Sequence, residues 1–446
     1  MIPAINASSI YSTLGNSNSL VPLAIKDIAN SLGLTAGSYV TGDKLEGKDR
    51  FIDEFGTQAI WLFGIPAYKK AIDLTLYKFL KIDPKFDVRN LSHKREKLLE
   101  KSIEYADASI KQSILDASKN AKFSKNLAFS KFVASTLLTI VSYAGLTKYR
   151  HNQTRKAAEK EILAEIQKDK ADFSYTKPEN KQAFAGLQNR NSKQPAFTGV
   201  IKEFMFNPVK NLMILDGAIT TERLTGSRNK QEFIGYTIKE GTFWAFMYFA
   251  SKPIQKFLEK SVDKNDKLPA SIELDSRVIE SEELEKAFKN GELTKSVQKV
   301  LNLQTQEELL DFIHNNPKDF TVQMAKKSDI LPILKNATQA DNIDYRQFID
   351  LDEFKGVAEK LNKLNNKFEL FKQKNIENKT IEAFLKNVKK LKRSSVLKNM
   401  GACIGVLGVL APATMVMVRK LSKDNKGFQV KEDLKKELAF NGKIIC

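Results

Sequence analysis

Two long apolar runs stand out in the pattern of hydrophobic and polar positions. Residues 132–147 contain no charged side chain over 16 residues, and Lys131 lies just before them, where its stem can carry the charge away from an apolar environment. Residues 400–418 form an uncharged run of 19 residues. As a helix this run would measure about 28 Å, close to the hydrocarbon thickness of about 30 Å. The sequence therefore predicts membrane helices over 127–149 and 396–421, with buried helices of a soluble core as the alternative.

Small residues repeat along the second apolar run. Gly401 and Gly405 are four positions apart, and Gly408 and Ala411 continue a face of little bulk. In an apolar helix this spacing lets another helix approach closely, so these four residues form a predicted helix-packing face. Pro412 is expected to kink the helix.

Two shorter apolar patches, 55–68 and 241–251, contain both tryptophans of the chain. Neither is long enough to span a bilayer, and lysines follow each of them. Aromatic rings are favoured at the membrane–water interface, so we expect helices that lie in that interface. For each patch taken alone, a place in a soluble core is the alternative. The predicted interfacial aromatic residues are Trp61, Phe63, Trp244, Phe246 and Tyr248.

The spacing of apolar positions predicts an all-α protein with a few apolar helices and an inserted soluble region. A long helical pattern begins near Ser92 and continues towards Lys170 without a proline. The expected parts are a loosely structured arm over 1–40 with one short helix, a helical region over 41–259 with apolar segments at 55–68, 127–149, 205–220 and 241–251, a soluble helical domain over 260–395, an apolar helix over 396–421 and a basic tail over 422–446.

Regular helical patterning marks the soluble region. Thr305 and Glu308 have the spacing of a capping box, in which each side chain satisfies a free amide at a helix start. Apolar residues then alternate by three and four from Phe354 to Phe371, which predicts a coiled-coil-like seam against a partner such as the next helix, with Phe384. Helices over 350–395 are expected to bind a protein partner or a second copy of the chain.

A short motif of acid, base, leucine, any residue and glycine, followed by a base, occurs at 43–47 and again at 222–226. Each copy leads to an aromatic patch, which favours two related halves of the kind that build a symmetric membrane core. Ordinary loop chemistry is the alternative explanation. The acids and bases of the two copies are expected to pair near the membrane surface. The repeated charged turns comprise Asp43, Lys44, Gly47, Arg50, Glu222, Arg223, Gly226 and Arg228.

Asp216 is a lone acid in the otherwise apolar stretch 211–220. An ionisable group buried in lipid would normally be functional, so Asp216 is a candidate buried acid. The alternative is that Asp216-Gly217 begins a turn.

The chain is strongly basic, with 72 lysines and arginines against 53 acids and a formal charge of +19. This surplus favours polyanions, and because arginine is scarce, anionic lipid is the expected partner rather than nucleic acid. Arg150 and His151 stand in a basic run that is expected to be solvated. The predicted lipid head-group contacts beside the second apolar run are Lys386, Lys389, Lys390, Lys392, Arg393, Arg419 and Lys420.

Recognisable catalytic chemistry is absent from the sequence. The chain has no phosphate-binding loop, nucleophile elbow, paired histidines or calcium loop, and Cys403 and Cys446 provide neither a disulfide framework nor a thiolate site. We therefore expect no catalytic residue, metal or cofactor. The first forty residues show no cleavable signal peptide.

Three functional hypotheses follow. The first is a membrane-associated scaffold or interaction protein, integral or peripheral, without enzymatic activity. The second is a small transporter or membrane enzyme built from two halves, with Asp216 and the charged turns lining a polar site, which requires those charges to converge. The third is a soluble nucleic-acid-binding protein whose apolar helices form its core.

Overall fold

In the part of the chain that the structure describes, the protein is all-α with no strand, which confirms the predicted fold class. Two helical stretches, Ala121–Ile166 and Ile381–Thr414, are long and apolar enough to cross a membrane, and they contain most of the two apolar runs. The computed structural model describes residues 20–41, 44–91, 96–169, 204–227, 230–263, 274–327, 344–373, 380–421 and 430–440, together with Tyr11 and Leu14.

The chain divides into two compact units. Unit 1 contains the described residues of 1–30, 62–138 and 240–410, and unit 2 those of 31–61, 139–239 and 411–446. The borders at 61/62 and 138/139 fall inside helices, where the sequence shows no change in composition.

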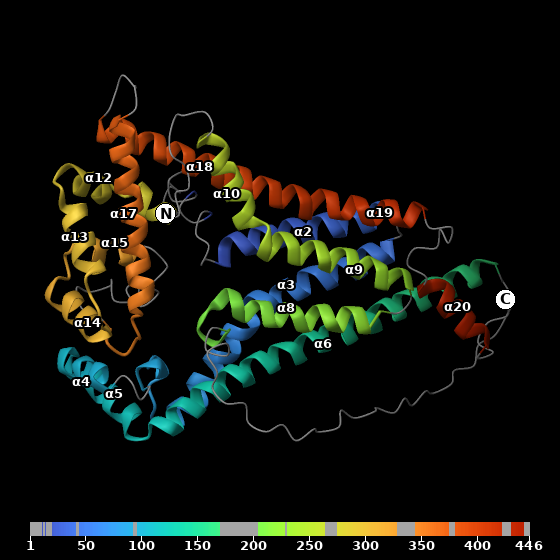
Figure 1. Ribbon diagram of the computed structural model, residues 1–446. Helices are drawn as coiled ribbons and strands as arrows, with labels where there is room; N and C mark the ends of the chain where they lie inside the picture. Colours follow the sequence, from blue (N-terminus) through green and yellow to red (C-terminus); the bar gives the residue numbers. More distant parts are fainter. Residues whose placement is uncertain are drawn as a thin grey trace, which may run out of the picture. The chain divides into compact units, whose positions relative to one another are not determined.

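Unit 2 takes its residues from long helices (Figure 1). Helix α3 (Lys44–Ile72) begins only three residues after α2 (Leu20–Thr41) ends. Helix α2 is 22 residues long, whereas we expected one short helix in a loosely structured arm over 1–40. Asn207 caps another helix, because its side chain accepts hydrogen bonds from the N–H groups of Val209 (3.0 Å) and Lys210 (3.1 Å). The helices that contribute are α2 (Leu20–Thr41), α3 (Lys44–Ile72), α6 (Ala121–Asp169), α8 (Pro208–Thr225), α9 (Lys230–Trp244), α19 (Ala411–Leu421) and α20 (Val430–Phe440).

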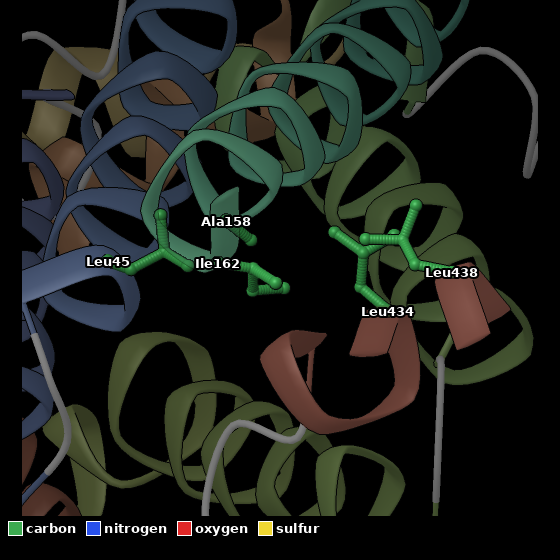
Figure 2. Close-up of a cluster of buried hydrophobic side chains, with 5 residues drawn as sticks. All are labelled: Leu45, Ala158, Ile162, Leu434 and Leu438. Atoms are coloured by element: carbon green, nitrogen blue, oxygen red, sulfur yellow. The ribbon is translucent and has the colours of Figure 1, made fainter. Parts of the chain in front are cut away.

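Helix α20 packs on α6 through a small apolar cluster. Leu434 and Leu438, one turn apart, face Ala158 and Ile162, and Leu45 of α3 completes the cluster (Figure 2). Ion pairs surround it: Lys435 Nζ lies 2.9 Å from a Glu165 oxygen, and Arg155 lies 2.6 Å from Glu437. Part of the expected basic tail is therefore a docked amphipathic helix.

The long helical pattern after Ser92 consists of three helices, and the first two and the start of the third lie in unit 1. The breaks fall between Tyr105 and Ala108, where Asp107 has an extended backbone, and at Asn120. Among the described residues, unit 1 contains three five-residue π-helical segments, each of which continues a preceding α-helix, and such segments are frequent at functional sites. The elements outside the helical domain described next are η1 (Asp73–Tyr77, π), η2 (Val88–Leu91), α4 (Glu96–Tyr105), α5 (Ala108–Lys119), η4 (Ala245–Phe249, π), α10 (Ser251–Asp263), α18 (Ile381–Gly405) and η6 (Val406–Leu410, π).

The helices between α10 and α18, named here the helical domain, belong to unit 1 and bury apolar side chains against one another and against α18. The Thr305 hydroxyl accepts from the Glu308 N–H (3.2 Å), which confirms the predicted cap, while the Glu308 carboxylate accepts from the Gln304 N–H (2.6 Å). The apolar residues of the predicted seam are all buried, and Phe368 lies 5.2 Å, between ring centroids, from Phe384 of α18. The helices are α11 (Ser276–Glu280), α12 (Glu282–Lys289), α13 (Glu292–Leu301), α14 (Gln306–Asn315), α15 (Phe320–Lys327) and α17 (Leu351–Gln373).

Large apolar side chains are exposed mainly outside this helical domain. Among the described residues of 274–373, only Leu370 is a strongly exposed large apolar residue. The longer helices expose many more, and these include Val21, Ile28, Leu32 and Val40 on α2, Phe51 and Phe63 on α3, Leu137, Leu138 and Val141 on α6, Phe233 on α9, and Leu397, Val409 and Leu410 on α18 and η6.

Candidate functional site

Helix α3 carries a run of ionisable residues on one buried face. Asp49 and Asp53 are four residues apart, as are Arg50 and Glu54, so helical periodicity brings the four side chains to one side. Asp53 is only 1% exposed, and the other three are buried or nearly so. These residues all belong to unit 2.

Three arginines from three helices surround the carboxylate of Asp53. Arg150 of α6 approaches closest, with Nη1 2.9 Å from Oδ2. Arg223 of α8 lies 3.4 Å from Oδ1, and Arg50 of α3 lies 3.6 Å from Oδ2. Asp53 of α3 is therefore joined to α6 and α8 by ion pairs with their arginines.

Two further acids extend this arrangement. Lys239 of α9 donates to a Glu54 oxygen at 2.7 Å, and both side chains are almost fully buried. Glu54 also lies 3.6 Å from Arg50. Asp49 accepts a hydrogen bond from the Thr154 hydroxyl at 2.5 Å and lies 3.9 Å from Arg150.

The ring of Tyr236 on α9 lies among the cations. Arg150 donates to its hydroxyl oxygen at 3.1 Å, and that hydroxyl donates to Asp53 at 3.5 Å. Arg50 and Arg223 lie 5.3 Å and 5.9 Å from the ring centroid, within the range of cation–π attraction. We call the whole set the charged core; it consists of Asp49, Arg50, Asp53, Glu54, Arg150, Arg223, Tyr236 and Lys239.

The charged core holds four cations and three carboxylates away from water. Removing ions from water is costly unless each is paired and hydrogen-bonded, and the contacts above provide that pairing. Such an arrangement can hold a charged group of a ligand at a fixed place inside the helices. Its chemistry is electrostatic, since it contains no nucleophile activated by an adjacent base.

The structure brings together some of the predicted charged turns, although in an unexpected way. Arg50 and Arg223 both converge on Asp53, and the half-buried Glu222 precedes Arg223 on α8. Lys44 is exposed at the start of α3. The arginines therefore meet a buried acid of α3 instead of pairing with the acid of the other motif copy.

The two motif copies also occupy different places in their helices. The first copy opens α3, and an added Cβ at Gly47 would lie 2.3 Å from the Tyr39 ring. The second copy closes α8, where Gly226 is the C-cap and its N–H donates to the Glu222 carbonyl at 2.7 Å. Asp43 and Arg228 lie outside the described residues. The duplication therefore stays a prediction.

Asp216 is buried in the middle of α8 and does not begin a turn. It precedes Arg223 by seven residues, which is two helical turns, or about 10.5 Å along the axis. The helix that supplies Arg223 to the charged core thus carries a second buried charge.

The predicted interfacial aromatics divide between two environments. Trp61 is 2% exposed because it follows Asp53 and Thr57 at four-residue steps on the buried face of α3, so it does not reach an interface. Phe63 lies on another side of the same helix and is 67% exposed. Trp244 is half-buried and packs on the half-buried Tyr248, with 5.3 Å between the ring centroids. The exposed Phe249 also lies near Trp244, with 6.3 Å between the ring centroids. Phe246 is also half-buried.

Only the later part of the predicted helix-packing face is in close contact. An added Cβ at Gly408 would lie 3.1 Å from the carbonyl oxygen of Ala29 in α2, and Ala411 is buried. An added Cβ at Gly401 or Gly405 would meet no atom of the described residues within 4 Å.

The predicted head-group contacts are also divided. Lys386 and Lys390 are exposed and Lys389 is half-buried. Lys392 is buried, and Arg393 is held by two hydrogen bonds to Glu280, at 2.7 Å and 2.6 Å. The side chains of Arg419 and Lys420 lie outside the described part of the structure.

Sequence reasoning missed the centre of the charged core. Arg150, expected on a solvated face, is only 3% exposed because Asp53 and Tyr236 enclose it. No sequence pattern described above points to Asp53 or Tyr236. The available signal was the four-residue repetition of polar positions in α3 that ends in Trp61, which marks a polar face that is nevertheless buried.

No protein-family model, curated protein or solved structure matches the chain. Within the described residues, no group of three or more histidine, cysteine, aspartate or glutamate side chains is placed to hold a metal ion. The charged core is therefore interpreted from its own geometry.

Proposed function

We propose that the chain is an integral membrane protein of the transporter class, in which the charged core binds a charged solute or coupling ion inside the helices. The observation that carries this proposal is an inverted distribution of side chains. Charged residues such as Asp53, Arg150 and Lys239 are buried, while apolar residues of the same helices, such as Val141 and Phe63, are exposed. A water-soluble protein has the opposite pattern.

The apolar helix α6 illustrates the point. In its most apolar 18-residue window only 33% is buried, and in the corresponding window around α18 39% is buried. A core helix of a soluble protein would be covered nearly all round by other helices. Lipid is the covering that suits exposed leucine, valine and phenylalanine over this length.

Buried charges favour transport over a purely structural role. Ionisable side chains within a membrane bundle are expensive, and where they occur they usually mark solute or proton pathways. A scaffold needs only packed apolar helices, whereas this bundle keeps seven charged side chains in the charged core. The second hypothesis required Asp216 and the charged turns to converge. Of those residues Arg50 and Arg223 meet, at Asp53, which supports the hypothesis in this part.

Exposed lysines on α18 support contact with anionic lipid as a second element of the proposal. Lys386 and Lys390 are exposed, whereas Arg393 is hydrogen-bonded to Glu280. Each basic residue near an anionic surface contributes about 1 kcal/mol. These lysines would hold the first turns of α18 at the head-group level.

The membrane part is tested by fractionating expressed protein and washing the membranes with carbonate and with high salt. We expect retention through both washes. Release by salt would show a peripheral protein, and recovery in the soluble fraction would overturn the proposal.

The transport part is tested with proteoliposomes on a solid-supported membrane. We expect a current on a concentration jump of at least one probe among phosphate, dicarboxylates, amino acids and alkali cations, and its loss in Arg223→Met. Membrane retention without any such current would favour the scaffold hypothesis.

A further inference from the structure

We infer that the charged core is an anion-binding site which the protein's own Asp53 carboxylate occupies in this structure, and that a carboxylate or phosphate group of a solute can take its place. This inference rests on the proposed function, because it names the class of solute that the charged core would bind. It is supported by the three arginines around Asp53, by their contacts with its carboxylate and by the buried hydroxyl of Tyr143.

The cations around Asp53 are the type that recognises anions with several oxygens. Three of them are arginines, whose planar guanidinium groups match carboxylate and phosphate and offer five N–H donors each. They come from α3, α6 and α8, so they approach Asp53 from different sides. A single carboxylate has two oxygens, which cannot accept hydrogen bonds from all the donors that three arginines present.

The contacts with Asp53 are accordingly uneven. Arg150 makes one short contact of 2.9 Å, but Arg223 and Arg50 remain at 3.4 Å and 3.6 Å, beyond good hydrogen-bond distance. Arg150 Nε and Arg50 Nη1 are buried and make no hydrogen bond among the described residues. Asp53 therefore neutralises the arginines without using their full donor capacity, and an anion with three or four oxygens would use more of it.

An unused donor lies beside Arg223. The Tyr143 ring centroid is 5.7 Å from the Arg223 guanidinium carbon, the side chain is 2% exposed, and its hydroxyl has no hydrogen-bond partner among the described residues. Arg223 also donates to the Thr57 hydroxyl at 3.2 Å. A buried phenol without a partner is uncommon, and an oxygen atom of a bound anion would provide one.

Glu54 provides a matched control for Asp53. It is the next residue on α3, it is equally buried, and it also contacts Arg50. Its principal partner is Lys239 on α9 instead of the arginines of α6 and α8. Removing the charge of Glu54 therefore changes the net charge by the same amount without vacating the place between Arg150 and Arg223.

The test measures thermal unfolding of the purified full chain in a neutral detergent. Sodium phosphate and sodium succinate are titrated against sodium chloride at equal ionic strength. We expect both anions to raise the Tm of the wild type. Asp53→Asn should bind them about tenfold more tightly, a gain of about 1.4 kcal/mol, because the competing carboxylate is gone. Arg223→Lys, which keeps the charge but loses the guanidinium fork, should reduce the shift.

Two outcomes would overturn the inference. One is a folded wild type whose Tm responds to phosphate and succinate no more than to chloride. The other is that Glu54→Gln strengthens binding as much as Asp53→Asn does, which would show a response to net charge alone. If Asp53→Asn cannot be purified in chloride, extraction in phosphate should restore folded protein, and failure of both preparations would leave the wild-type titration to decide.

The phosphate group could belong to a lipid head group, so phosphatidic acid in mixed micelles is a separate arm of the titration. A response to phosphatidic acid without a response to free phosphate would identify a lipid site and overturn the solute site. Membrane retention does not depend on any of these results, so failure of the anion site and failure of the membrane proposal are distinguishable.

Discussion

Glu54 and Lys239 form an ion pair whose two side chains are almost fully buried. Lys239→Met would leave the Glu54 charge without its principal partner, and we expect a loss of about 3 to 5 kcal/mol in the free energy of unfolding. The double variant with Glu54→Leu should recover much of this loss, because no uncompensated charge remains. Denaturation midpoints of the two single variants and the double variant test this coupling.

The pair between Lys435 and Glu165 is the control, because it joins the same charge types with both side chains half exposed. Lys435→Met should leave the midpoint unchanged within error. Equal effects of Lys435→Met and Lys239→Met would contradict the argument that burial determines the cost.

Asp83 gives a pH-dependent contribution and lies outside the two apolar helices α6 and α18. Burial alone would raise the pKa of its carboxyl, but hydrogen bonds from Ser113 (2.7 Å), the Lys85 N–H (2.8 Å) and Arg346 (2.8 Å) lower it below the usual value. An acid whose pKa is lower in the folded state stabilises the protein above its unfolded pKa of about 3.9, and this contribution disappears as the pH falls through the folded pKa.

The corresponding measurement compares the Tm of the wild type and Asp83→Asn across pH. The wild type should be more stable at neutral pH, and the difference should shrink progressively below pH of about 4. A difference that stays constant in acid would refute this account.

At the scale of elements, the close approach of α2 to the π-helical segment η6 depends on Gly408. A larger side chain there would meet the backbone carbonyl of Ala29, which cannot rotate away as a side chain can. Gly408→Leu should therefore lower the Tm. Gly401→Leu is the matched control, since an added Cβ meets no atom within 4 Å, and it should be neutral or stabilising because glycine costs about 1 kcal/mol in a helix. A larger loss for Gly401→Leu would show that this open face is packed.

At the scale of the whole molecule, the membrane proposal predicts which surfaces meet lipid. The two native tryptophans, Trp61 and Trp244, are first replaced by phenylalanine. In this background Phe63→Trp should be quenched by brominated acyl chains, because this position is exposed on α3. Leu370→Trp, exposed on the helical domain α11–α17, should instead be quenched by iodide in water. With only Trp244 replaced by phenylalanine, the native Trp61, which is 2% exposed, should resist both quenchers. Iodide quenching at position 63 would place α3 in water and contradict the proposal.

The features that the sequence predicts well are local ones. The apolar runs, the Thr305 cap and the seam of α17 depend on residues within a few helical turns. The charged core depends on pairs from different helices that are separated by 86 to 185 positions, such as Arg150 with Tyr236 and Lys239 with Glu54. A single sequence gives no pairing information over that distance, so Arg150 reads as one more solvated base.

That separation has a consequence for how the protein is made. Lys239 is synthesised 185 residues after Glu54, which at about 5 to 20 residues per second is a delay of about 10 to 40 seconds. When α3 emerges, Arg50 is the one cation of the charged core that is already present beside its acids, and Arg150, Arg223 and Lys239 follow later. In the proposed membrane protein, α3 therefore cannot enter lipid alone when it leaves the ribosome. It needs either the insertion machinery or a position at the membrane surface until α8 and α9 have been synthesised.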